Sequence, residues 1–237
     1  MKKSRRIQLI DTLRGFVIVV MIFYHLLYDM GAAGLAPWRD ILPVLNFIQP
    51  LNCIFVLLAG VSCRFSRSNL RRGAMCFAVA LVITLVTSLP FIDSPVIFGV
   101  LHLLGICMML FGVAGPLLDR IPRPLQPFYY GALAWLSKWA VENISVGEAA
   151  RFLFPLGWTA PGFFSSDYFP LFPWLFIFLL GTWAGTWVTE RRLPGWFYDC
   201  RGIRPLNFLG RHSLIIYVLH QPVLYGIVTL ISMAKNP

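Results

Sequence analysis

Long apolar segments separated by short polar loops run through the whole chain. Seven of them approach the roughly 20 residues that an α-helix needs to cross the hydrocarbon core of a bilayer. They cover about 7–30, 41–63, 73–90, 96–118, 125–141, 168–189 and 206–232, and the fifth is the shortest. The pattern predicts an all-α fold: a polytopic bundle of about seven transmembrane helices that forms a single domain over residues 1–237.

Basic residues are concentrated in alternate loops. One set contains Lys2, Lys3, Arg5, Arg6, Arg64, Arg67, Arg71, Arg72, Arg120, Arg123, Arg191, Arg192, Arg201 and Arg204. The loops of the opposite set and the C-terminal end contain only Arg39, Lys138, Arg151 and Lys235. Because Lys and Arg are enriched in cytoplasmic loops, we expect a cytoplasmic N-terminus and, after seven spans, a C-terminus on the outer face.

The composition agrees with a membrane protein. The chain is 58% hydrophobic and 13% charged, about half the charged fraction of a soluble domain. The net charge of +10 lies mainly in loops, so we expect the lipid bilayer rather than nucleic acid as a partner. The five cysteines form no CxxC pair, which indicates neither a disulfide framework nor a zinc site. We expect an integral membrane protein.

The first apolar segment contains Asp11, Arg14, His25 and Asp29. Ionisable groups in a membrane span are costly and usually mark a functional path. Asp11 and Arg14 are three residues apart near the entry end, where a local ion pair would satisfy them. His25 and Asp29 lie on one helix face, and a carboxylate in the last turn is disfavoured by the helix dipole. We therefore expect a functional role for His25 and Asp29.

A histidine held by a carboxylate is equipped to act as a general base. We therefore interpret His25 as the catalytic residue and Asp29 as the residue that orients it.

Two further histidines, His102 and His220, are predicted at similar depth in the outer half of the bundle. They are candidates for substrate binding, or they hydrogen-bond neighbouring helices and have only a structural role. His212 is expected at the cytoplasmic interface. No two histidines share a helix at ligand spacing, so we predict no metal site.

Asn46, Gln49 and Asn52 recur at intervals of three in the second segment. This polar stripe has to face protein or water, either as a ladder of hydrogen bonds or as the wall of a hydrophilic tunnel. Asp167, at the outer end of the sixth segment, and Gln221, beside Pro222 in the seventh, are further substrate-binding candidates. The outer loop 142–167 contains Trp, Pro and Gly, which suits a lid or an acceptor platform, and its middle is expected to form a short helix.

Arg14 and His25 are eleven residues apart, about 16 Å along a helix. A cation near the cytoplasm and a base deeper in the membrane suit a long substrate with an anionic end, which is the shape of acyl-coenzyme A. Arg64, Arg71, Arg211 and His212 would add phosphate contacts from the same side, although the positive-inside rule alone explains loop arginines.

Four sequence blocks also resemble a known family. They are Asp11-Thr-Leu-Arg-Gly15 with Met21 to Asp29, Phe98 to Gly105, Asp167 to Trp174, and Leu209 to Pro222. In this order they resemble the heparan-alpha-glucosaminide N-acetyltransferase catalytic-domain family, particularly its short bacterial members. The Arg14–His25 spacing is also similar to that of membrane enzymes that O-acylate bacterial surface polysaccharides. Both resemblances imply transfer of an acyl group from cytoplasmic acyl-CoA to an acceptor on the other face.

The leading hypothesis is therefore an integral-membrane acyltransferase that uses acetyl-CoA or another acyl-CoA. His25 would act as base or as acyl carrier, and the resemblance implies a sugar or glycoconjugate as the acceptor. Arg14, Arg64, Arg211 and His212 are the candidates for donor binding. The candidates for substrate binding are Gln49, Asn52, His102, Asp167, His220 and Gln221.

Two other classes remain open. A transporter or flippase would use the histidines to line a polar path, and a structural partner subunit would use the polar residues only to hold helices together. Whether copies of the chain associate with one another is also open.

Overall fold

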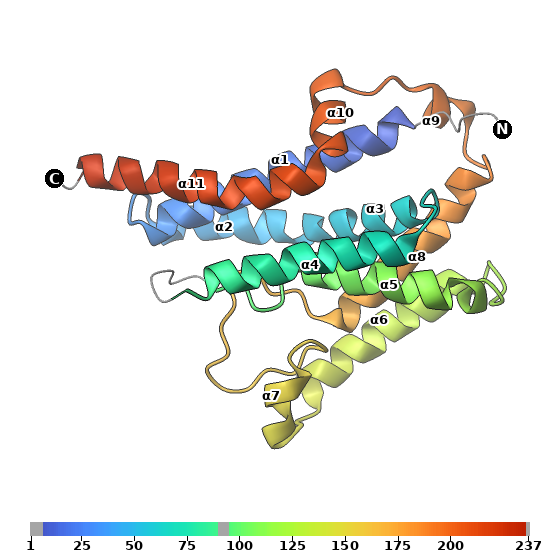
Figure 1. The fold of residues 1–237 in the computed structure, drawn as a ribbon, viewed down its shortest axis with the longest axis horizontal. Helices are drawn as coiled ribbons and strands as arrows, with labels where there is room; N and C mark the ends of the chain where they lie inside the picture. Colours follow the sequence, from blue (N-terminus) through green and yellow to red (C-terminus); the bar gives the residue numbers. More distant parts are fainter. Residues whose placement is uncertain (1–6, 90–94, 236–237) are drawn as a thin grey trace. The chain divides into compact units, whose positions relative to one another are not determined.

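The computed structural model describes residues 7–89 and 95–235. The basic residues Lys2, Lys3, Arg5 and Arg6 lie outside the described residues. The described chain is helical without strands, as the apolar pattern predicts. Its elements (Figure 1) are α1 (Gln8–Ala32), α2 (Trp38–Ile48), η1 (Gln49–Leu51), α3 (Asn52–Cys63), α4 (Asn69–Thr87), α5 (Val100–Leu118), α6 (Gln126–Asn143), η2 (Gly147–Ala149), α7 (Ala150–Leu153), α8 (Leu171–Thr189), α9 (Gly195–Asp199), α10 (Arg204–Arg211) and α11 (Ser213–Lys235).

The helices pack in two compact units. The terminal unit combines both ends of the chain, residues 1–55 and 193–237, and the central unit contains residues 56–192. Helix α3 begins in the first and ends in the second. The single domain predicted from the sequence therefore stays a prediction, and each unit is described by itself.

In the terminal unit, α1 packs against α2, α10 and α11. Its first half lies against α10 so closely that a Cβ atom at Gly15 would collide with the carbonyl of Leu206, and one at Gly210 with the carbonyl of Asp11. Thr12, Gln8 and Asn207 add a hydrogen-bond network at the same place. Small residues permit this backbone approach, which fixes the C-terminal part of the chain to the first helix.

Helices α1 and α11 run parallel. Helix α10 meets α1 near Asp11 and Gly15, and α11, which follows it, meets α1 further along, where Gln221 bonds to Asp29. Both helices thus advance in the same direction, and they lie side by side in Figure 1. A first and a last transmembrane helix that are parallel require an odd number of crossings.

Six helical stretches are long and apolar enough to cross a membrane: 8–32, 38–63, 69–87, 100–118, 171–189 and 213–235. The parallel arrangement of α1 and α11 requires one more, and α6 supplies it, because it coincides with the predicted fifth segment. The polar side chains of α6 lower the hydropathy of this helix. The predicted polytopic bundle of about seven helices is confirmed.

The central unit confirms that α6 runs the full length of a neighbouring span. Its start lies beside the end of α8, where Arg123 pairs with Glu190 at 2.6 Å and Trp183 donates to the Arg123 carbonyl. Its end lies beside the start of α8, because Gly157 is close to both Val141 and Phe172. Helix α6 is therefore antiparallel to α8, as a separate crossing must be.

Close helix contacts also build the central unit. A Cβ atom at Gly60 in α3 would collide with the Phe178 carbonyl, and one at Gly181 in α8 would collide with the Leu57 carbonyl. The sequence pattern Gly181-Thr-Trp-Ala-Gly185 is typical of such an interface. Helices α4 and α5 pack together beside it.

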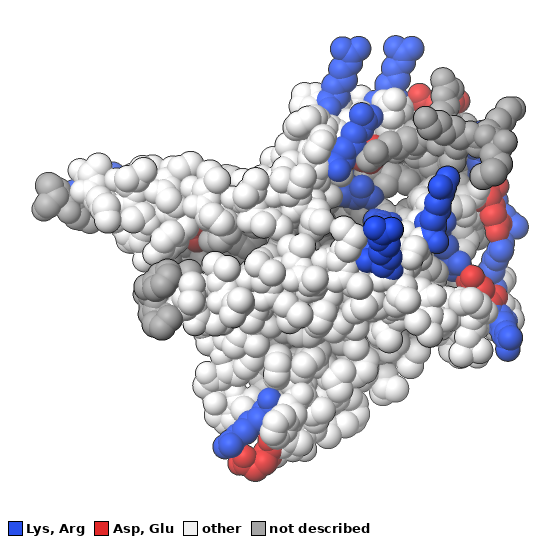
Figure 2. All heavy atoms as spheres, viewed as in Figure 1, with Lys and Arg blue, Asp and Glu red and all other residues white. Residues whose placement is uncertain are grey.

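Charged side chains gather at the helix ends. In the central unit they lie where α3, α5 and α8 end and α4 begins, with a second small group over α7; in the terminal unit they lie over α10 (Figure 2). Most of α11 carries no charge. The alternation of the basic loops is therefore reproduced within each unit, while a cytoplasmic N-terminus stays a prediction.

The second apolar segment differs in one respect from the continuous helix expected over 41–63. The helix begins earlier, at Trp38, and is interrupted by the 3₁₀ turn Gln49–Leu51. Pro50 is the cause, because its ring lacks an N–H and clashes with the preceding turn. The predicted polar stripe falls on this interruption.

We expect Gly181→Ala to destabilise the protein. The added methyl group meets the backbone of Leu57, which cannot move aside as a side chain can, so the cost is about 1–3 kcal/mol. The midpoint of thermal unfolding in detergent, followed by tryptophan fluorescence, should fall by about 5 °C. Gly131→Ala in α6 is the control, because nothing lies within 4 Å of a Cβ there; an equal loss in both variants would contradict the packing argument.

The crossing of α6 can be tested by cysteine labelling. Cys53 and Cys200 are first replaced by Ser, since the other three native cysteines are buried. In intact cells a membrane-impermeant maleimide should label a Ser145→Cys variant, and it should label an Arg120→Cys variant only after permeabilisation. Labelling of both from the same face would place both ends of α6 on one side.

Candidate functional site

Two histidines from distant parts of the sequence meet in the terminal unit. His25 is on α1 and His220 is on α11, and their ring centroids are 4.8 Å apart with the ring planes at 79°. His220 is buried, with 9% of its surface exposed. The sequence predicted both residues at similar depth, and the structure brings them into contact.

Each of these imidazoles is oriented by a backbone carbonyl. His25 Nδ1 lies 2.9 Å from the carbonyl oxygen of Met21, and His220 Nδ1 bonds in the same way to the carbonyl of Tyr217. A carbonyl only accepts, so Nδ1 carries the hydrogen in both neutral rings. The Nε2 atoms are left with their lone pairs, and that of His220 is buried without a hydrogen-bond partner.

Asp29 is buried next to this pair and is held by Gln221. The side-chain amide of Gln221 donates to both carboxylate oxygens at 3.1 Å. The sequence predicted that Asp29 orients His25 by a direct hydrogen bond. Between the described groups the Met21 carbonyl takes that place, while the Asp29 carboxylate is engaged by α11 and acts on His25 through its charge.

A second polar cluster lies where α1 meets α10. Asp11 is buried and pairs with Arg14 at 3.7 Å and with Arg211 at 3.5 Å. Arg14 also donates to the Gly210 carbonyl. One carboxylate thus faces two guanidinium groups, and the cluster keeps a net positive charge at this end of α1.

The other donor-site candidates have different surroundings. His212 follows α10 and is exposed; its Nδ1 bonds to the Phe208 carbonyl at 2.9 Å. Arg64 belongs to the central unit, where it forms a two-point ion pair with Asp119 at 2.7 and 2.8 Å, donates to the Thr182 carbonyl and covers the ring of Phe111. All three guanidinium nitrogens of Arg64 are therefore used in joining helix ends.

His102, also in the central unit, is buried with both ring nitrogens satisfied. Its Nδ1 accepts from the Gly99 amide at 3.2 Å, and its Nε2 lies 3.2 Å from Thr84 Oγ1. Because the Thr84 hydroxyl donates to the Val96 carbonyl, it accepts from His102. Asp167 accepts from the Val100 amide at 3.0 Å. Both residues bond to the start of α5. For His102 this fits the structural alternative that the sequence left open, and substrate binding by Asp167 stays a prediction.

Gln49 and Asn52 flank the 3₁₀ turn of the terminal unit. Gln49 is exposed and Asn52 is half-buried. Within residues 7–89 and 95–235, neither is brought into a hydrogen bond with the His25 cluster, so a role for them stays a prediction.

The four sequence blocks that carry the family resemblance meet in pairs. The first and the fourth form the His25 cluster, and the second and third are joined by backbone hydrogen bonds from Ser166 to Pro95 and from Phe169 to Phe98. A family model described as "Heparan-alpha-glucosaminide N-acetyltransferase, catalytic" matches residues 6–222. The chain belongs to this family. Comparison with curated proteins and with solved structures finds no match.

Membership of the heparan-alpha-glucosaminide N-acetyltransferase catalytic family covers most of the chain and confirms the resemblance. It implies a membrane acetyltransferase. The match includes both units and all of the residues named above, so neither unit is an unrelated addition. Among the described residues, no group of three or more His, Cys, Asp and Glu could hold a metal ion.

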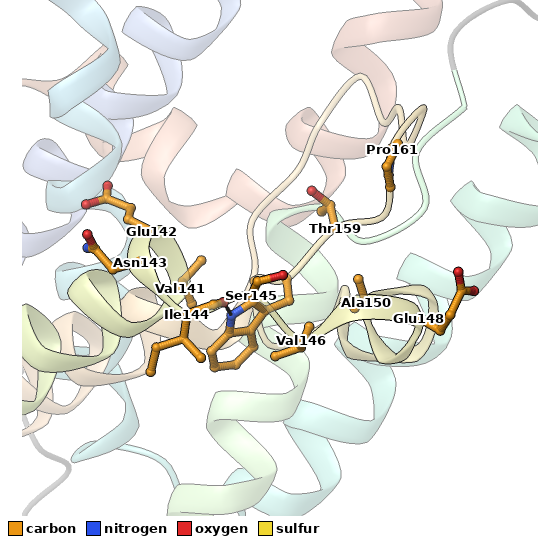
Figure 3. Close-up of a pocket in the computed structure, with 13 residues that line it drawn as sticks. Val141, Glu142, Asn143, Ile144, Ser145, Val146, Glu148, Ala150, Thr159 and Pro161 are labelled. Atoms are coloured by element: carbon orange, nitrogen blue, oxygen red, sulfur yellow. Dashed lines mark hydrogen bonds between the residues drawn. The ribbon is translucent and has the colours of Figure 1, made fainter.

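A groove of about 880 Å³ lies at the far end of α6 (Figure 3). It is lined by the end of that helix and by the loop that the sequence marked as a platform, and η2 and α7 form the short helix expected there. Trp158 lines it with its indole fixed by a bond to the Ile144 carbonyl at 2.8 Å. Polar side chains of Asn143, Ser145 and Thr159 complete the lining.

Several positions of these sites were not found from the sequence. Thr84 and the carbonyl groups of Met21 and Tyr217 orient candidate side chains, and Asn207 bonds α10 to Thr12 of α1. Backbone carbonyls leave no signal in a sequence. Thr84 lies in an apolar run, where a lone hydroxyl is too common to be informative.

Replacing His102 should lower the stability of the protein and leave its affinity for acetyl-CoA almost unchanged. His102→Ala removes the bonds to Gly99 and Thr84 and leaves the start of α5 without its cap, which costs about 2 kcal/mol. The thermal midpoint should fall by several degrees while acetyl-CoA affinity, measured by calorimetry, stays within about twofold. A stable variant with lost acetyl-CoA binding would contradict the structural role.

Proposed function

We propose that the protein transfers an acyl group, in the first place acetyl, from cytoplasmic acyl-CoA to an amine or hydroxyl of a sugar at the outer face of a bacterial inner membrane. The observation that supports this is the His25 cluster. It presents an imidazole lone pair at Nε2, fixed by the Met21 carbonyl, in a member of a membrane acetyltransferase family.

In the proposed reaction His25 acts as the general base. The acceptor nitrogen or oxygen attacks the thioester carbonyl carbon while its proton passes to His25 Nε2. The C–S bond then breaks, its electron pair goes to sulfur, and the proton of the imidazolium protonates the leaving thiolate. The products are the acylated acceptor and free CoA thiol. Asp29 favours the transient imidazolium by its negative charge.

An acyl-histidine would be another use of the same lone pair. The two routes differ when the acceptor is omitted. Only the covalent route would then transfer one radiolabelled acetyl group from acetyl-CoA to the protein. Rapid acid quenching and gel filtration separate the two routes.

The donor end of the site is proposed at α10. Arg14 and Arg211 exceed the single carboxylate of Asp11 in charge, and Arg211 and His212 are exposed to a ligand from that side. Arg14 precedes His25 by eleven helical residues, about 16 Å. This separation allows the phosphates of CoA to lie at α10 while the thioester reaches His25. The proposal does not include Arg64 in the donor site, because its guanidinium group is used in the packing of the central unit.

The acceptor end is proposed to involve His220 and Gln221. The Nε2 atom of His220 and Oε1 of Gln221 are buried acceptors without partners, and a sugar offers the hydroxyl or amine donors that would satisfy them.

The direct test replaces the base. His25→Ala should lower acyl transfer by about 10²–10⁴-fold, the range of general base catalysis, with acetyl-CoA binding within about twofold of the native protein. Purified protein in nanodiscs is supplied with acetyl-CoA and a panel of amino and neutral sugars, and thiol release and acylated sugar are measured. Arg151→Ala on the surface of α7 is the control.

Unimpaired transfer by the His25→Ala variant would exclude the proposed catalyst. Substrate movement across the bilayer without acyl-CoA would favour a transporter instead.

A further inference from the structure

We propose that His220 is a positioning residue for His25, and that the two imidazoles together hold the single proton that acyl transfer releases. This inference rests on the proposed function, in which His25 takes that proton. It assigns to His220 a part in the chemistry beyond contact with the acceptor.

The geometry of the ring pair carries the argument. The centroid distance of 4.8 Å and the angle of 79° place an edge of one ring against the other ring. An imidazole edge is positive when protonated, and a neutral neighbour offers both a π face and a lone pair to it. Because both Nδ1 atoms are engaged by carbonyl groups, the only nitrogen through which either ring can gain a proton is Nε2.

Burial makes the pair take one proton rather than two. His220 and Asp29 are 9% and 8% exposed, so an uncompensated charge between them is costly. One imidazolium balances the one carboxylate, whereas two imidazolium ions would leave a buried positive charge. A protonated His25 beside a neutral His220 is the arrangement that satisfies this balance, and the unpartnered His220 Nε2 is the acceptor left over for it.

No other charged group on the neighbouring described elements competes for this role. On α1 and α11 the nearest polar neighbours are Tyr24, Tyr217 and Gln221. Lys235, the charged residue of α11, lies in its last turn, fifteen residues beyond His220. Helix α2 carries Arg39 and Asp40, which are exposed and pair with each other at 3.6 Å. The charges of the first half of α1 and of α9 and α10 lie toward the opposite end of α1 and belong to Asp11, Arg14, Asp199, Arg204, Arg211 and His212.

The hydrogen-bond capacity of residue 220 can be separated from its volume by two substitutions. His220→Phe keeps a ring but has no acceptor, whereas His220→Gln keeps an acceptor oxygen. Loss of an acceptor disfavours the imidazolium of His25. We therefore expect His220→Phe to lower kcat about tenfold and to move the acidic limb of the pH profile of kcat/KM to lower pH by about one unit.

The conservative variant should reverse most of this change. His220→Gln is expected within about threefold of the native kcat, with the acidic limb near its native position. Tyr225→Phe, an exposed position on the same helix, is the control for changes in α11. A native pH limb and native kcat in His220→Phe, or equal impairment in both His220 variants, would overturn the proposal.

A measurement on the native protein keeps the proposal testable if His220→Phe does not fold. Nitrogen-15 NMR of histidine-labelled protein in detergent follows all four histidines between pH 5 and 8, with His25→Gln and His220→Gln for assignment. We expect His25 and His220 to take up one proton between them. Independent protonation of both histidines would overturn the inference. Loss of activity in His25→Ala would still support the proposed function in that case. Failure of the inference can therefore be distinguished from failure of the proposed function.

Discussion

The bond between Gln221 and Asp29 constrains more of this protein than any other single contact. A carboxylate in a transmembrane helix has no water to accept hydrogen bonds from and needs donors supplied by the protein. Gln221 supplies two, at 3.1 Å each. This places α11 parallel to α1, brings His220 onto His25, and through the parallel direction makes the number of crossings odd. The candidate site and the topology therefore have one physical origin.

The close approach of backbones makes that bond geometrically reachable. Gly15 and Gly210 permit α10 to touch α1, and the Asp11–Arg211 pair fixes the rotation of the two elements. Helix α11 then starts at a defined position on α1, and Gln221, about two turns after its first residue Ser213, meets Asp29. The same device, glycines at helix contacts, joins α3 and α8 in the central unit. In a membrane, where apolar burial gives little driving force between helices, such contacts replace a hydrophobic core.

The sequence was sufficient for the fold class and for the location of most spans, because apolar runs of the right length are a strong signal. It singled out His25 and Asp29, because ionisable groups inside a span are rare, and their role in the chemistry stays a prediction. The carboxylate four residues after His25 suggested a direct bond to the imidazole, whereas Nδ1 bonds to the Met21 carbonyl, four residues before it. His102 shows the opposite problem. Whether a buried histidine is satisfied depends on partners such as Gly99 and Thr84, and only the fold brings these together.

The two polar clusters of α1 differ in charge, and in the proposed reaction they would bind different parts of the substrates. At the α10 end, two guanidinium groups face one carboxylate, and the excess positive charge favours an anion such as a phosphate group. At the α11 end, one carboxylate accompanies two imidazoles whose Nδ1 atoms are engaged by carbonyl groups. This end accepts protons and hydrogen-bond donors and disfavours anions. A thioester with an anionic carrier at one end and a nucleophile that loses a proton at the other matches both requirements along a single helix.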